Sequence, residues 1–178
     1  DTVQPNIKIR DSKLSYLASA FDAFKAGKPE NILFIGEHGI GKTYLVNSFV
    51  EDTDLSDTLL IQVTCFQNER TYLLQPWNTI FLKLSDYIIE HQIVVPGNYM
   101  EVVENFFPTF SSTTIDEFNN TLSYRSFQNA LLKIFQIVCH HNKVLLYIDN
   151  INAMDSISLD ILSSLIRLCN ESLMVLLT

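Results

Sequence analysis

The stretch ILFIGEHGIGKT, from Ile32 to Thr43, decides the fold, because it places a glycine-rich loop directly after a short apolar run. The residues from Gly36 onward fit the pattern GxxxxGK[ST]. A strand, a glycine loop and a helix in this order bind phosphate: glycines let backbone N–H groups turn inward, and the helix start presents its unpaired N–H groups to the anion. A glycine turn that precedes a helix by accident is the alternative. The sequence favours a nucleotide phosphate site.

The residues of this loop have separate predicted roles. Lys42 reaches the β- and γ-phosphates, and Thr43 provides a hydroxyl ligand for Mg²⁺. His38 is interpreted as a spacer, because the backbone N–H groups at that position bind the anion. The predicted contacts with ATP or ADP cover the whole loop and the start of the helix: Gly36, Glu37, His38, Gly39, Ile40, Gly41, Lys42, Thr43 and Tyr44.

A second part of the site is predicted where an apolar run ends in Asp149. A carboxylate at the end of a buried strand can hold a water of the Mg²⁺ shell opposite Thr43, although an Asp after a strand is also a common turn residue. The next residue, Asn150, occupies the position where rapidly hydrolysing P-loop ATPases often have an acid. An amide orients water but cannot accept its proton.

Asp149 and Asn150 are therefore the catalytic candidates, and slow or absent hydrolysis is expected unless Asp155, Glu37 or a partner supplies a base. For Asp155 itself, capping of the next helix is favoured over catalysis. Trp77 could stack on a base, but its position after Pro76 at a helix start is more typical of a core or interface residue.

Strands alternate with helices along the rest of the chain, which predicts an α/β fold with a mostly parallel sheet covered on both faces and ligands at the carboxyl ends of the strands. After an extended lead-in, Asp11 is expected to cap a first helix that stops at Gly27. Residues 92–123 are expected to form an irregular or helical insertion. The expected strands span 32–35, 59–64, 144–148 and 173–178, and the further helices span 42–50, 76–91, 124–140 and 158–169.

Length and composition limit the possible functions. The 178 residues match one domain, and a net charge of −8 with a pI near 4.8 argues against a general nucleic-acid surface, so DNA contact would need a domain outside this chain. Three cysteines without metal-ligand spacing predict buried, reduced thiols and a cytoplasmic location. No apolar stretch reaches the roughly eighteen residues of a membrane span. The start at Asp1 and the final apolar run indicate a fragment of a larger protein.

Four blocks of the sequence resemble the STAND class of signal-transduction ATPases, which is related to AAA+ proteins. The resemblance implies a P-loop three-layer sandwich truncated before its helical lid, with Arg10 of the first block near the adenine. The chain departs from the family pattern at Ile9, at Asn150 and at the pair Asn152 and Ala153. The four blocks are IKIRDSKL at 7–14, IGEHGIGKT at 35–43, CFQNERTYLLQPW at 65–77 and IDNINAMDSISLD at 148–160.

This resemblance implies a nucleotide-gated switch in a bacterial multidomain transcriptional regulator, in which ATP in place of ADP favours an open or oligomeric form. Three alternatives remain open: an ATPase module attached to a class III adenylate cyclase, an AAA+ motor or loader, and a degenerate loop in an interaction scaffold. The retained Gly41, Lys42, Thr43 and Asp149 count against the scaffold, and Asn150 counts against a fast motor.

Overall fold

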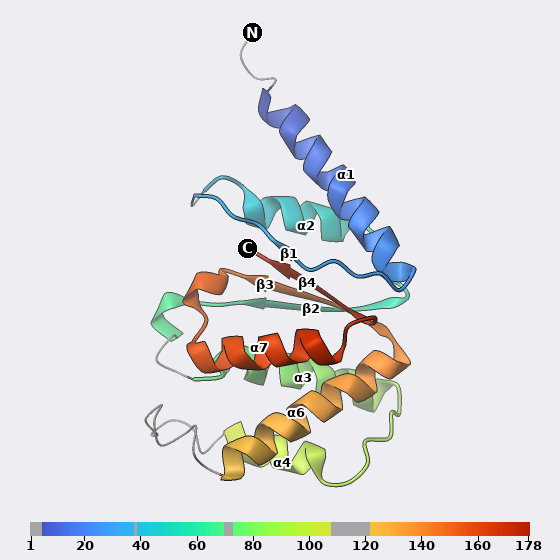
Figure 1. Ribbon diagram of the computed structural model, residues 1–178, viewed down its shortest axis with the longest axis vertical. Coiled ribbons are helices and arrows are strands. Elements are labelled where there is room, and N and C mark those ends of the chain that lie inside the picture. Colours follow the sequence, from blue (N-terminus) through green and yellow to red (C-terminus); the bar gives the residue numbers. More distant parts are fainter. Residues whose placement is uncertain (1–4, 38, 70–72, 108–121) are drawn as a thin grey trace.

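The computed structural model describes residues 5–37, 39–69, 73–107 and 122–178. At the centre of this part of the chain lies a four-stranded sheet in which all strands are parallel (Figure 1). The strands lie in the order β1-β4-β3-β2. Their apolar runs are nearly continuous, as expected for a sheet covered on both faces. The predicted α/β class is therefore confirmed. The strands are β1 (Ile32–Leu33), β2 (Thr58–Thr64), β3 (Lys143–Asp149) and β4 (Leu173–Leu177).

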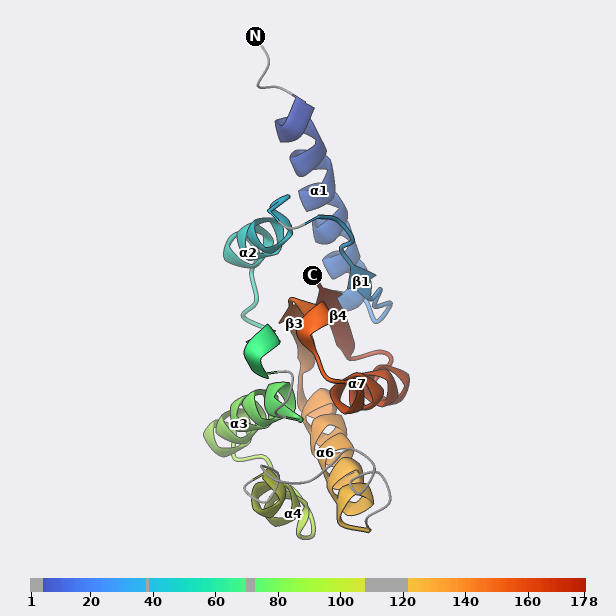
Figure 2. The same ribbon diagram turned by 90° about the vertical axis from the view of Figure 1, so that its left-hand side faces the viewer.

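Helices cover both faces of this sheet and make it a three-layer structure (Figures 1 and 2). The helices α1 (Pro5–Lys25) and α2 (Lys42–Asp52) lie on one face. The helices on the other face are α3 (Gln75–Glu90), α6 (Leu122–His141) and α7 (Ser156–Leu168). The short helix α4 (Tyr99–Phe106) packs on α6, farthest from the sheet. The described residues also include the 3₁₀ turns η1 (Gln67–Glu69) and η3 (Ile151–Ala153).

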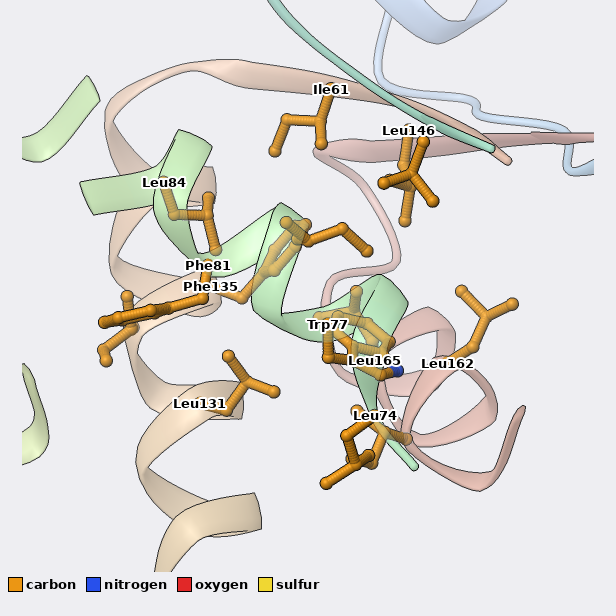
Figure 3. Close-up of a cluster of buried hydrophobic side chains, with 14 of the residues drawn as sticks. Ile61, Leu74, Trp77, Phe81, Leu84, Leu131, Phe135, Leu146, Leu162 and Leu165 are labelled. Carbon is orange, nitrogen blue, oxygen red and sulfur yellow. The ribbon is translucent and has the colours of Figure 1, made fainter. Parts of the chain in front are cut away.

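Alternation along β3 and β4 divides the core into two clusters, since successive side chains of a strand point to opposite faces. On the α1 and α2 face, Leu145 and Tyr147 of β3 pack with Phe21 and Phe24 of α1 and Val46 of α2. On the other face lies a larger cluster, shown in part in Figure 3, which includes Ile61, Trp77, Phe135, Leu146 and Leu165. Both sets are buried, so each face of the sheet is covered by closely packed side chains.

The N-terminal segment differs from the prediction. The sequence predicts an extended lead-in followed by a helix that Asp11 caps, but α1 already begins at Pro5 and Asp11 lies inside it. Proline fits the first turn of a helix, and neither Gly nor Pro interrupts the chain between Asn6 and Ala26. The predicted stop at Gly27 is confirmed, with φ +82°.

Strand β1 is also shorter than the predicted 32–35. The Phe34 N–H still donates to the Leu177 carbonyl at 2.9 Å, but Ile35 is 89 % exposed as the chain turns into the loop. The segment 92–123 contains α4 and the start of α6, and its residues 108–121 lie outside the described part.

The three cysteines, Cys65, Cys139 and Cys169, are buried and form no disulfide, which confirms the predicted buried thiols. Among the helices described, none combines the length and apolar character that crossing a membrane demands.

Candidate nucleotide-binding site

The glycine loop joins β1 to α2 at the carboxyl end of the sheet, where open α/β sheets bind ligands. Gly39 and Gly41 have φ of +82° and +89°, a region that residues with a Cβ rarely adopt. Gly41 is also the N-cap of α2 and provides no side-chain cap. The first turn of α2 therefore presents backbone N–H groups that an anion can bind.

Lys42 is the first residue of α2, and its ammonium group folds back over the loop. Its Nζ donates to the carbonyl oxygens of Gly36 at 2.5 Å and Glu37 at 3.0 Å. A Cβ added at Gly36 would lie 3.2 Å from Cγ2 of Ile40, so the loop is closely wound at its start. These two backbone contacts hold the lysine at the phosphate loop, and phosphate oxygens would be stronger partners for it than carbonyls.

Thr43 and Asp149 meet across the site although 106 positions separate them in the sequence. The Thr43 hydroxyl donates to Asp149 Oδ1 at 2.9 Å. Asp149 ends β3, which lies inside the sheet, and Thr43 lies in the first turn of α2. The structure therefore brings together the two side chains that the sequence predicts as the protein's contribution to a Mg²⁺ site.

Thr178 is a third polar side chain of this group, and the sequence reasoning missed it. Its hydroxyl donates a short hydrogen bond to the same Asp149 Oδ1. Thr178 directly follows β4, the neighbour of β3 in the sheet. A polar residue after an apolar strand was the available signal, but the pairing of β4 with β3 was needed to place it beside Asp149.

The Asn150 side chain is hydrogen-bonded to the end of β2. Its φ is +59°, and its amide Nδ2 donates to the Cys65 carbonyl at 2.8 Å, while the Cys65 N–H donates to the Asp149 carbonyl at 3.0 Å. These contacts join the ends of β2 and β3. In this arrangement the Asn150 amide supports the strand ends, and its role toward an attacking water stays a prediction.

Asp155 has a structural role, as the sequence favoured. It caps α7, accepting from the Ser158 N–H at 2.8 Å and the Ser158 hydroxyl at 2.6 Å. It also accepts from the Leu74 N–H at 3.2 Å, and Trp77 Nε1 donates to the Ser158 carbonyl at 3.0 Å. All four residues are buried, so the preferred interpretations of Asp155 as a cap and Trp77 as core are confirmed.

For the other predicted contact residues, the structure gives less detail. Glu37, Ile40 and Tyr44 are exposed at the loop and the start of α2. His38 lies outside the described residues. Arg10 lies in α1, and its contact with an adenine stays a prediction.

The residues present fit a magnesium nucleotide. Two positive-φ glycines and a helix N-terminus suit a phosphate chain, Lys42 supplies a cation, and Thr43 with Asp149 supplies hard oxygen ligands of the kind that Mg²⁺ prefers. When bound, Mg²⁺ would neutralise phosphate charge, and Lys42, Thr43 and Asp149 are the side chains that would hold the group.

A parallel sheet in which the glycine loop after β1 lies beside a carboxylate at the end of β3 defines the class of P-loop nucleoside triphosphatases. Within that class, the family model for the AAA ATPase domain matches residues 6–177, so the chain belongs to this family. Comparisons with curated proteins and with solved structures gave no significant match.

Proposed function

We propose that this domain binds Mg²⁺-ATP and ADP and acts as the regulatory switch of a cytoplasmic, multidomain bacterial transcriptional regulator. Nucleotide binding by an ATPase module follows from the family. The hydrogen bond between Thr43 and Asp149, beside Lys42, is the observation that most supports the proposal. Both side chains offer oxygen atoms of the kind that Mg²⁺ prefers, and Thr43 directly follows the glycine loop and Lys42.

Slow or absent hydrolysis is part of this proposal. Rapid hydrolysis needs a group that accepts a proton from the attacking water, and the residue after Asp149 is an amide that donates to the Cys65 carbonyl. The γ-phosphate and its Mg²⁺ would therefore persist long enough to favour one arrangement of the domain over another. Self-association in the ATP state and DNA binding through a separate domain belong to the same proposal.

An AAA+ motor or loader is the main alternative, and the rate of phosphate release distinguishes it. We expect a slow rate for the wild type. A rapid rate that is lost when Asn150 is replaced would contradict the switch and favour the motor. Choosing between a transcriptional regulator and a cyclase-attached module requires the sequence that flanks this domain.

The test of nucleotide binding is calorimetry on the wild type and on Lys42→Ala. Because Lys42 provides the cation nearest the loop carbonyls, its loss should weaken Mg²⁺-ATP binding at least about tenfold, or about 1.4 kcal/mol. Lys133→Ala, an exposed lysine on α6, is the matched control and should bind as the wild type does. Equal affinity of Lys42→Ala and the wild type would contradict the proposed site.

A further inference from the structure

Tyr147 is a buried tyrosine in β3, and the site described above gives its hydroxyl no role. Its side chain is 0 % exposed, and its hydroxyl has no hydrogen-bond partner among the described residues. A buried hydroxyl in that condition has lost its contacts with water without replacement, which destabilises the fold, and most buried polar groups are paired. A phenylalanine would fill the same space without this cost.

The backbone places this hydroxyl beneath the candidate site. Tyr147 lies two residues before Asp149, so both point to the face that α2 covers. Tyr147 pairs in register with Leu176 of β4, and Thr178 lies two residues beyond Leu176 on the same face. Burial raises the pKa of the Tyr147 hydroxyl, and Thr178 and Thr43 lower it in part, so both side chains lie near the hydroxyl although neither is within hydrogen-bonding geometry of it.

The hydrogen bonds in this group determine what the hydroxyl can do. Thr43 and Thr178 both donate to Asp149 Oδ1, so each has used its only proton and each still has lone pairs that can accept. Tyr147 has a proton to donate. When the Thr43 oxygen serves as a metal ligand it becomes a poorer acceptor, which leaves Thr178 as the better partner.

We propose that Tyr147 is a positioning residue of the nucleotide site: its hydroxyl donates to Thr178 when Thr43 and Asp149 hold Mg²⁺-nucleotide, and thereby fixes the Asp149 carboxylate. The inference rests on the proposed function. It gives the tyrosine a hydrogen bond in the nucleotide-bound protein that the structure described above does not contain. Hydrogen bonds would then connect Tyr147 to Thr178 and Thr178 to Asp149, while Thr43 contacts the same carboxylate.

The experiment compares the wild type with Tyr147→Phe by thermal unfolding and by calorimetry, without nucleotide, with ATP and EDTA, and with Mg²⁺-ATP. Without nucleotide, the Tm of Tyr147→Phe should equal or exceed that of the wild type, because an unpaired buried hydroxyl is removed. Its affinity for Mg²⁺-ATP should fall about three- to tenfold, the range of one ordinary hydrogen bond. Its affinity for ATP in EDTA should be unchanged.

Two further variants make the result specific. Tyr87→Phe removes a hydroxyl from the half-buried tyrosine that stacks on His91 at the end of α3, away from the site, and should match the wild type in every nucleotide condition. In a Thr178→Val background, adding Tyr147→Phe should cause no further loss of Mg²⁺-ATP affinity, because the two hydroxyls act through one contact.

A lower Tm for Tyr147→Phe without nucleotide, together with unchanged Mg²⁺-ATP affinity, would show a purely structural hydroxyl and overturn the inference. Failure of the wild type to bind Mg²⁺-ATP at all would instead refute the proposed function, and this inference with it. The wild-type titration alone distinguishes the two failures.

Discussion

The glycine loop at 36–43 and the contact between the starts of α3 and α7 both come from conspicuous sequence blocks, yet the structure uses them in opposite ways. In the loop, Ile40 is 68 % exposed and the Lys42 ammonium group donates to two backbone carbonyls. In the second region, which we call the α3–α7 brace, every member is buried and hydrogen-bonded: Leu74, Trp77, Asp155 and Ser158. A conspicuous motif can therefore serve either binding or stability.

The two regions differ in the burial and the hydrogen bonding of their polar groups. The polar groups of the α3–α7 brace have intramolecular partners, so they contribute to stability and have little capacity for a ligand. The loop presents backbone N–H groups and an ammonium group at the surface, where they can exchange partners. Substitutions in the brace should consequently reduce the free energy of unfolding, and substitutions in the loop should reduce nucleotide affinity.

The largest expected effect on stability is that of Asp155→Ala. It removes the cap of α7 and leaves the Leu74 N–H and the Ser158 hydroxyl without their buried acceptor. We expect a loss of about 3 kcal/mol in the free energy of unfolding, measured in urea. Asp160→Ala, at an exposed position of the same helix, is the control and should change stability by about 0.5 kcal/mol or less. A similar loss in both variants would remove the distinction between brace and surface.

A smaller effect on stability is expected for Asn150→Asp, because Asn150 follows Asp149 of the nucleotide site and also supports the strand ends. Asp tolerates the positive φ but cannot donate to the Cys65 carbonyl, so the free energy of unfolding should fall by about 1 kcal/mol. The new carboxylate can accept a proton, and the rate of phosphate release should rise. Unchanged stability would show that the strand ends do not depend on this amide.

The smallest effect on stability belongs to Lys42→Ala, the variant with a large expected effect on binding. Its two hydrogen bonds go to exposed loop carbonyls that water can satisfy, so the free energy of unfolding should change by about 0.5 kcal/mol or less. Thermal unfolding without nucleotide provides the measurement. A large loss would mean that the loop, like the α3–α7 brace, is built mainly for stability.

The fold could be predicted from the sequence wherever the pattern is local. The apolar runs of β2, β3 and β4 and the helical periods of α3, α6 and α7 gave elements that agree with the structure within a few residues. The prediction for the N-terminal segment was wrong because the residues from Pro5 to Lys13 have no clear apolar period, although neither Gly nor Pro interrupts them after Pro5 and α1 includes them.

The site, too, was predictable only where its residues belong to a local sequence pattern. The glycine loop, with Lys42 and Thr43, is contiguous in sequence, and the end of β3 identified Asp149. Thr178 could not be found, because only the pairing of β4 with β3 places it beside that carboxylate. Tyr147 precedes Asp149 by two residues in β3, but its position next to Thr178 depends on the same pairing. The turn of Asn150 toward Cys65 likewise depends on the neighbouring strand β2.

The pairing of Thr43 with Asp149 is the central feature of this account, and the effect of Mg²⁺ on ATP affinity tests it most directly. The measurement is calorimetric titration with ATP, in Mg²⁺ and in EDTA, for the wild type and for Asp149→Asn, which keeps the size of the side chain and removes its charge. We predict that Mg²⁺ raises the affinity of the wild type at least about tenfold and that of Asp149→Asn very little. An equal response to Mg²⁺ in both proteins, or none in the wild type, would contradict the account.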